Sequence, residues 1–263
     1  MKSLNQYINE VSSDLLKRAH NEQVRRNGGV ESNRSRKFAK GAHAALDREM
    51  SLDDSVSGTE RRYDYVDLGL PSGTMWATCN VGATKPEDPG LLFQFGRVDG
   101  YRCGDRSNKF RMDDQNKQDT ANEYIPLTAS GKLYKHRIKN ILDLEDDAAH
   151  VNMGGAWRMP TNAQLKELID NTRYEVETIN KVKGMMFTSD INGNQIFIPF
   201  GGGWVDGGYF GERFSANMWS SNVTSGFTSY KYAYSLVCGE DGYADINNIY
   251  RSAACSVRGV FKK

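Results

Sequence analysis

The stretch from Gly201 to Tyr250 has the residue types of a binding surface. Glycines precede Trp204, and tyrosine and asparagine then recur among glycine and serine. A tyrosine ring offers a large, rigid contact with a polar tip, and an asparagine adapts its hydrogen bonds to its partner. This composition predicts a ligand-binding surface formed by Trp204, Tyr209, Phe210, Tyr230, Tyr232, Tyr234, Tyr243, Asn247, Asn248 and Tyr250. The alternation of Tyr230, Tyr232 and Tyr234 also fits one face of a core strand, and the spacing alone leaves both interpretations open.

The residues that carry covalent or metal chemistry form no comparable pattern. The four cysteines, Cys79, Cys103, Cys238 and Cys255, include no close pair, and the four histidines lack the spacing of a metal site. Neither an activated nucleophile nor an acid–base pair can be named. We therefore expect no enzyme activity, no catalytic residue, no metal site and no cofactor. The cysteines allow several disulfide pairings as well as free thiols, and the sequence does not choose among them.

The elements that position these residues fall into two parts of different composition. The chain has 263 residues and a formal net charge of +1, yet residues 1–62 carry 12 Lys/Arg against 9 Asp/Glu and residues 63–263 carry 22 against 24. Tyr7 and Phe38 are the only aromatic residues before Tyr63. We therefore expect two domains, a helical anchoring arm at residues 1–62 and a globular binding domain at residues 63–263. No apolar run exceeds three residues, so membrane insertion is not expected.

The arm carries two apolar stripes at helical spacing. Two short amphipathic helices with so few large side chains bury little by themselves, so they need a partner to dock on. The residues expected to anchor the chain to another protein are Leu4, Ile8, Val11, Leu15, Phe38 and Leu46.

The arm also carries a basic run from Lys17 to Arg48, with nine basic residues against three acidic ones. The run lacks the interleaved aromatic residues that support single-strand binding, so a solvated helix face explains it better than nucleic acid does. Met1 and Lys2 are followed by no apolar segment, and we therefore expect no secretory signal peptide.

The globular part alternates short β-like runs with turn residues. Met75–Thr78 has the composition of a strand, and the runs Met185–Thr188 and Gln195–Ile198 flank an Asn-Gly pair, which is a strong hairpin signal. One helix is expected at about Glu145–Asn152. A second is expected to start at Thr161, capped reciprocally with Gln164. The fold class is therefore α+β, with many short strands and two helices.

Six blocks of the globular part form a recognisable series: Val66–Ala83, Leu142–Asn152, Gly154–Thr161, Trp219–Ser221, Tyr250–Ser252 and Ser256–Val260. In this order they resemble the Fibrobacter succinogenes major paralogous domain family. That family resembles a variant of the C-type-lectin fold and is related to retroelement-diversified ligand-binding proteins. The resemblance implies a C-type-lectin-like binding domain, preceded here by the helical arm, with a variable surface near its C-terminus. Trp76, Trp157 and Trp219 lie in these blocks and are expected in the core.

Calcium is the one cofactor that the resemblance raises, because many C-type lectins bind sugars through it. The Glu-Pro-Asn and Gln-Pro-Asp motifs of those lectins are absent. A structural calcium ion near Glu240-Asp241 or Asp245 stays an open alternative, because carboxylate oxygens are its preferred ligands.

The function expected from the arm and the resemblance is that of a non-enzymatic phage virion protein, associated with a tail or capsid. The arm would bind other virion proteins, and the C-terminal region would bind a host-surface glycan or protein, in a multimeric assembly. Two alternatives stay open: an adhesin on a bacterial cell surface with the same binding module, and a structural protein that decorates or cements the particle. We do not expect a nucleic-acid partner.

Overall fold

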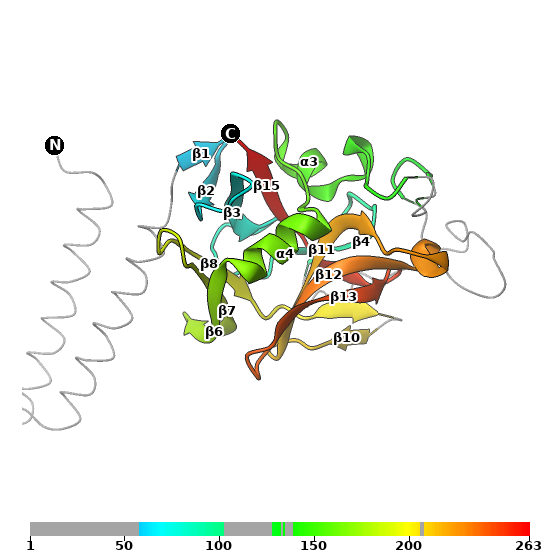
Figure 1. Ribbon diagram of the computed structural model, residues 1–263. Coiled ribbons are helices and arrows are strands. Elements are labelled where there is room, and N and C mark those ends of the chain that lie inside the picture. Colours follow the sequence, from blue (N-terminus) through cyan, green and yellow to red (C-terminus); the bar gives the residue numbers. More distant parts are fainter. Residues whose placement is uncertain (1–57, 103–127, 133, 135–138, 206–207) are drawn as a thin grey trace, which may run out of the picture. The chain divides into compact units, whose positions relative to one another are not determined.

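The structure is a computed structural model that describes residues 58–102, 128–132, 134, 139–205 and 208–263 (Figure 1). The chain divides into two units, Met1–Asp54 and Ser55–Lys263, and every described residue belongs to the second. The predicted anchoring residues Leu4, Ile8, Val11, Leu15, Phe38 and Leu46, together with Cys103, lie outside the described residues. Within the ranges given above, no helix is long and apolar enough to cross a membrane.

The described part is a strand-rich α+β domain with two α-helices, which confirms the predicted class at this level. Its helical segments are the 3-10 turn η2 (Leu144–Asp146), α3 (Ala148–Met153), α4 (Asn162–Asp170) and the 3-10 turn η3 (Phe227–Tyr230). The first eight strands are β1 (Gly58–Glu60), β2 (Tyr63–Asp67), β3 (Thr74–Asn80), β4 (Leu91–Gln94), β5 (Tyr101–Arg102), β6 (Thr172–Ile179), β7 (Val182–Ser189) and β8 (Gln195–Pro199). The others are β9 (Gly203–Val205), β10 (Gly208–Phe210), β11 (Ser215–Val223), β12 (Tyr232–Gly239), β13 (Ala244–Tyr250), β14 (Ala254–Ser256) and β15 (Arg258–Lys262).

The strands form three sheets. The largest has the order β10-β9-β14-β11-β12-β13, with β4 paired to β14 and β5 paired to β4. A second sheet has the order β1-β2-β3-β15, so the last strand of the chain lies beside the first strands of this domain (Figure 1). The third is the antiparallel meander β6-β7-β8. In the largest sheet, β10 and β13 are therefore the two opposite edges.

The predicted hairpin is present. Strands β7 and β8 pair antiparallel from Thr188 opposite Gln195 to Gly184 opposite Pro199. Gly193 has a φ of 79°, the left-handed backbone that the Asn-Gly signal implies. The predicted strand at Met75–Thr78 is the centre of β3, and it is buried along most of its length.

Of the two predicted helices, one is confirmed and one needs correction. Helix α4 begins after Thr161, and the full capping box with Gln164 is present. The helix expected at Glu145–Asn152 is instead broken at Asp147, between η2 and α3. The Asp147 carboxylate caps α3 by accepting from the His150 N–H at 2.9 Å, and it also accepts from the Met159 N–H at 2.9 Å. An extended backbone at Asp147 is needed for this, so one continuous helix is excluded.

The core consists of two clusters on opposite faces of the largest sheet. Trp219 lies in one, with Trp157, and its indole N–H donates to the carbonyl of Phe93 at 2.7 Å. Met218, the preceding residue, lies in the other, with Trp76. The three tryptophans are 0% exposed, which confirms that they are core residues and not ligand contacts.

Candidate ligand-binding site

Four of the predicted site residues come together on one face of the paired strands β12 and β13, of which β13 is the edge strand. Tyr232 lies opposite Tyr250, and Tyr234 lies opposite Asn248, so the four side chains project from the same face of β12 and β13. We call Tyr232, Tyr234, Asn248 and Tyr250 the tyrosine face. The rings of Tyr232 and Tyr250 lie 4.5 Å apart between centroids, and Tyr250 is 53% exposed.

The tyrosine face is the more exposed end of a surface whose other end is buried: Asn248 and Tyr250 are exposed, and Tyr232 and Tyr234 are half-buried. Further along the same strands, Leu236 and Ile246 point to the same side and pack in the cluster that contains Leu165 and Leu168 of α4. Helix α4 contacts both β12 and β13. The sheet under the tyrosines is therefore held by a packed core, while the tyrosines themselves extend beyond the helix.

Tyr234 is fixed by the turn beside it. Its hydroxyl accepts from the Ser225 N–H at 3.2 Å and lies 3.3 Å from the Ser225 hydroxyl. This turn leads into η3, where Phe227 is 91% exposed. Phe227 was not among the predicted residues, although it is an aromatic residue within the stretch that the composition singles out.

The opposite face of β13 carries a second polar group. The Asn247 amide donates to the Tyr243 hydroxyl at 3.2 Å, and that hydroxyl lies 3.4 Å from Asp245 Oδ2. Because side chains alternate along a strand, Tyr243 and Asn247 do not share a face with the tyrosine face. The predicted pair Asn247 and Asn248 is thus divided between the two sides of one strand.

The other predicted residues lie elsewhere. Trp204 is half-buried on β9, and Tyr209 is its partner in register on β10, at the edge of the sheet opposite β13. Phe210 follows on β10, and for it and Tyr209 only the strand position is described. Tyr230 ends η3, with the ammonium of Lys231 5.5 Å from its ring centroid. The predicted binding residues are therefore spread over several elements, and the largest group of them lies on β12 and β13.

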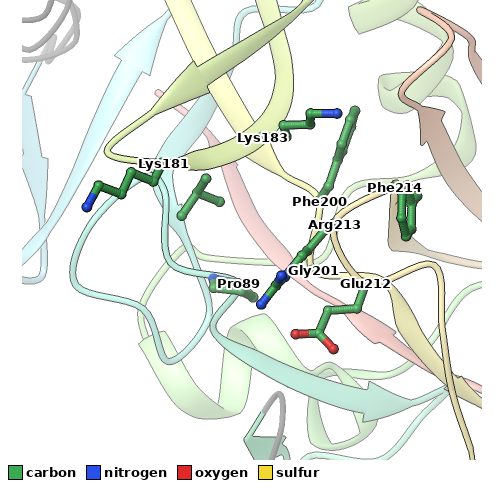
Figure 2. Close-up of a pocket in the computed structure, with 9 residues that line it drawn as sticks. Pro89, Lys181, Lys183, Phe200, Gly201, Glu212, Arg213 and Phe214 are labelled. Atoms are coloured by element: carbon green, nitrogen blue, oxygen red, sulfur yellow. The ribbon is translucent and has the colours of Figure 1, made fainter.

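A cavity of about 590 Å³ lies at a different place, and no motif in the sequence predicted it (Figure 2). Lys181 lies in the two-residue turn between β6 and β7, and Lys183 is on β7. Phe200 follows β8, and Arg213 and Phe214 precede β11. The lining residues are scattered over the chain. Four of them, Gly201, Glu212, Arg213 and Phe214, fall in the tyrosine-rich stretch, but none is among its predicted binding residues.

Burial keeps three thiols and the Tyr134 phenol of the described residues in their protonated forms at neutral pH. Burial raises the pKa of the Cys238 and Cys255 thiols well above the usual range. Burial, followed by the hydrogen bond to Asp146, likewise raises the pKa of Tyr134. Cys79, Cys238 and Cys255 are all free thiols. None of these side chains is an activated nucleophile, because the thiolate or phenolate is the reactive form.

The carboxylates considered for calcium have other partners. Glu240 pairs with Lys183 at 3.0 Å, and Asp241 accepts from the Tyr243 N–H at 3.1 Å. In the part of the chain that the structure describes, no three His, Cys, Asp or Glu side chains gather in a way that could hold a metal ion.

Comparison with known proteins adds no relative: no family model, no curated protein and no solved structure matches the chain. The residues and their geometry therefore carry the functional argument.

Proposed function

We propose that this chain is a non-enzymatic phage virion protein whose C-terminal domain has a C-type-lectin-like fold and binds a host-surface ligand. The observation that carries the proposal is the tyrosine face. Three tyrosines and an asparagine project from one side of an edge strand pair, beyond the helix that buries the rest of that surface. Tyrosine-rich surfaces of this kind bind through ring contacts and hydroxyl hydrogen bonds without covalent chemistry.

The tyrosine face is also organised before a ligand arrives. The rings of Tyr232 and Tyr250 pack against each other, and the Tyr234 hydroxyl is tied to Ser225. Side chains that are already ordered lose less conformational entropy on binding, which improves affinity for a given contact area. This order supports a role of the tyrosine face in ligand binding.

The lectin-like part of the proposal is supported by where the blocks of the family resemblance lie. Val66–Ala83 contains β3 and the whole segment between β2 and β3, and Trp157 and Trp219 are fully buried. The block Ser256–Val260 contains Arg258, which is 0% exposed and donates hydrogen bonds to two sheets. These blocks are the framework of the domain, and the tyrosine face lies largely between them.

The binding role is tested with Tyr232→Ala/Tyr250→Ala in assembled particles. We expect adsorption to host cells to fall at least about tenfold, because a pair of aromatic contacts at the centre of an interface commonly supplies 2 kcal/mol or more. Ile191→Ala, at a residue that is 54% exposed in the turn between β7 and β8 and outside the predicted surface, is the control and should adsorb normally. Normal adsorption by the double variant, with intact particles, would exclude the tyrosine face and favour a role in decoration.

The anchoring role of residues 1–62 is tested in the full chain. Ile8→Asp/Leu15→Asp places charges in the first apolar stripe and should abolish incorporation into particles, because a charge cannot be buried there without a partner. Asn5→Asp/Ser12→Asp adds the same charges to the same segment outside the stripe and should be incorporated normally. Equal incorporation of the two variants would contradict the anchor.

A further inference from the structure

We propose that the cavity beside Arg213 is a second binding site, which takes a carboxylate-bearing sugar ring. It lies between the β6–β7 turn, the segment after β8 and the segment before β11, and it includes none of the residues of the tyrosine face (Figure 2). The proposal does not depend on the function of that face. It rests on the shape, charge and backbone of the cavity.

The cavity has a firm floor and a size suited to a small ligand. Its volume is about 590 Å³, and ligand sites commonly range from roughly 300 to 1,000 Å³. Phe200 is only 3% exposed and closes the interior side. A Cβ at Gly201 would lie 2.7 Å from the Cβ of Pro89, so only glycine allows these two parts of the wall to come together. The floor and this wall are built of residues that cannot move aside easily.

The charges that line the cavity favour an anion. Lys181, Lys183 and Arg213 are cationic, and Glu212 is the one anionic residue of the lining. The carboxylates next to this group are already engaged: Glu240 pairs with Lys183 at 3.0 Å, and Glu87 accepts from the Asn180 amide at 2.9 Å. Opposite charge in a partly enclosed site attracts an anionic ligand.

Arg213 is the cation placed to receive the ligand's anionic group. Lys183 has Glu240 as a partner, and Figure 2 shows Lys181 pointing away from the other side chains. The guanidinium of Arg213 extends toward Pro89, with the Glu212 carboxylate on the same side (Figure 2). No hydrogen bond or ion pair of the described residues holds this guanidinium. Arginine binds a carboxylate through two parallel N–H···O bonds, which gives this site its preferred group.

The backbone at Arg213 adds an independent observation. Its φ is 69°, in the left-handed region that disfavours every residue with a Cβ. The Arg213 N–H donates to the Phe200 carbonyl at 3.0 Å, and the Phe214 carbonyl accepts from the Glu240 N–H at 2.9 Å, so both sides of the position are held. Glycine would adopt this conformation without strain. Arginine at this position places its side chain at the cavity, but its backbone is strained relative to that of glycine. Strain of this kind concentrates at binding sites.

The neighbours of Arg213 favour a sugar over a flat aromatic acid. Phe214 is 58% exposed and offers an apolar ring to one face of a pyranose. Glu212 offers carboxylate oxygens that accept hydrogen bonds from sugar hydroxyls, which an aromatic acid does not supply. A carboxylated pyranose matches all three groups: its carboxylate binds Arg213, its hydroxyls bind Glu212, and its ring packs on Phe214.

The test is titration of the full chain with D-glucuronic acid, followed by calorimetry or by NMR of the protein. Saturable binding at millimolar concentration is expected, with glucose and benzoate each at least about tenfold weaker, because glucose lacks the carboxylate that binds Arg213 and benzoate lacks the hydroxyls that bind Glu212. Absence of saturation, equal binding of glucose, or tighter binding of benzoate than of glucuronic acid would each overturn the proposal.

Variants separate a binding role of Arg213 from a structural one. Arg213→Gly removes the guanidinium and relieves the left-handed strain, so its melting temperature should be no lower than that of the native chain while glucuronic acid binding falls at least about tenfold. Phe214→Ala should also weaken binding. Arg173→Gln, which changes an exposed arginine of β6 paired with Asp190, is the control and should bind normally. Normal binding by Arg213→Gly would show that the cavity does not use this residue and would overturn the assignment.

Discussion

At the scale of single residues, Arg258 shows how a buried charge holds two sheets together. Its guanidinium donates to the carbonyls of Ala77 and Thr78 on β3 at 3.2 and 2.9 Å, and to Phe197 on β8 at 2.9 Å. Its Nε donates to Asn80 at 2.9 Å. Burial lowers the pKa of Arg258 to about 10, so the side chain is still charged at neutral pH. The charge has hydrogen-bond acceptors on every side, which offsets its desolvation.

Replacing this residue should be one of the most damaging single changes in the domain. Arg258→Met keeps much of the volume but leaves the carbonyls of β3 and β8 buried without donors. We expect a loss of about 3–5 kcal/mol in the free energy of unfolding, measured by chemical denaturation. Arg173→Met, at an exposed arginine, should change it by less than about 0.5 kcal/mol. A small effect of Arg258→Met would mean that the strands pair without this link.

The buried cysteines lead to a prediction of reactivity. Cys238 and Cys255 are each 0% exposed, and burial raises the pKa of both thiols, so neither forms the thiolate that alkylating agents attack. Iodoacetamide at neutral pH should leave both unmodified in the folded chain and modify both in denaturant, as measured by mass spectrometry of peptides. Modification of either one under native conditions would show that this part of the core opens.

At the scale of elements, the sequence predicts features that depend on neighbouring residues and does not predict those that depend on long-range contacts. The capping box of Thr161 and Gln164 was predictable because its partners lie three residues apart. The break at Asp147 was not, because one of the two N–H groups that its carboxylate accepts belongs to Met159, twelve residues further on. The alternation of tyrosines on β12 was visible in the sequence. That β13 is an edge, and how far along its length α4 covers the face that carries Tyr250, depends on long-range packing that no local pattern encodes.

The cap of α4 is a prediction at this scale. The Gln164 N–H donates to the Thr161 hydroxyl at 3.2 Å, and the Thr161 N–H donates to Gln164 Oε1 at 2.9 Å. Thr161→Ala removes the first bond and should lower the free energy of unfolding by about 1 kcal/mol. Thr161→Ser keeps the acceptor and should cost much less. If both changes have equal effects, the methyl group of the threonine matters and the cap does not.

At the scale of the whole domain, the two candidate sites draw on different parts of one framework. The tyrosine face lies on β12 and β13, and the cavity is built from the β6–β7 turn and the segments around Phe200 and Phe214. The cavity could not be predicted because its walls come from four separate stretches of the chain, none of which has a recognisable motif. Sites that share no residue and no contact act independently, so changes at one should leave the other intact.

This independence can be measured in both directions. Tyr232→Ala/Tyr250→Ala should bind D-glucuronic acid with the affinity of the native chain, within about twofold, because neither ring belongs to the cavity. In the free energy of unfolding, the effect of Arg213→Gly combined with the two tyrosine changes should equal the sum of the separate effects to within about 0.5 kcal/mol. A tenfold weaker sugar affinity in the tyrosine variant would instead mean that β12 and β13 transmit their state to the segment before β11, since β12 pairs directly with β11. The two sites would then be coupled, and the inference that they act independently would be wrong.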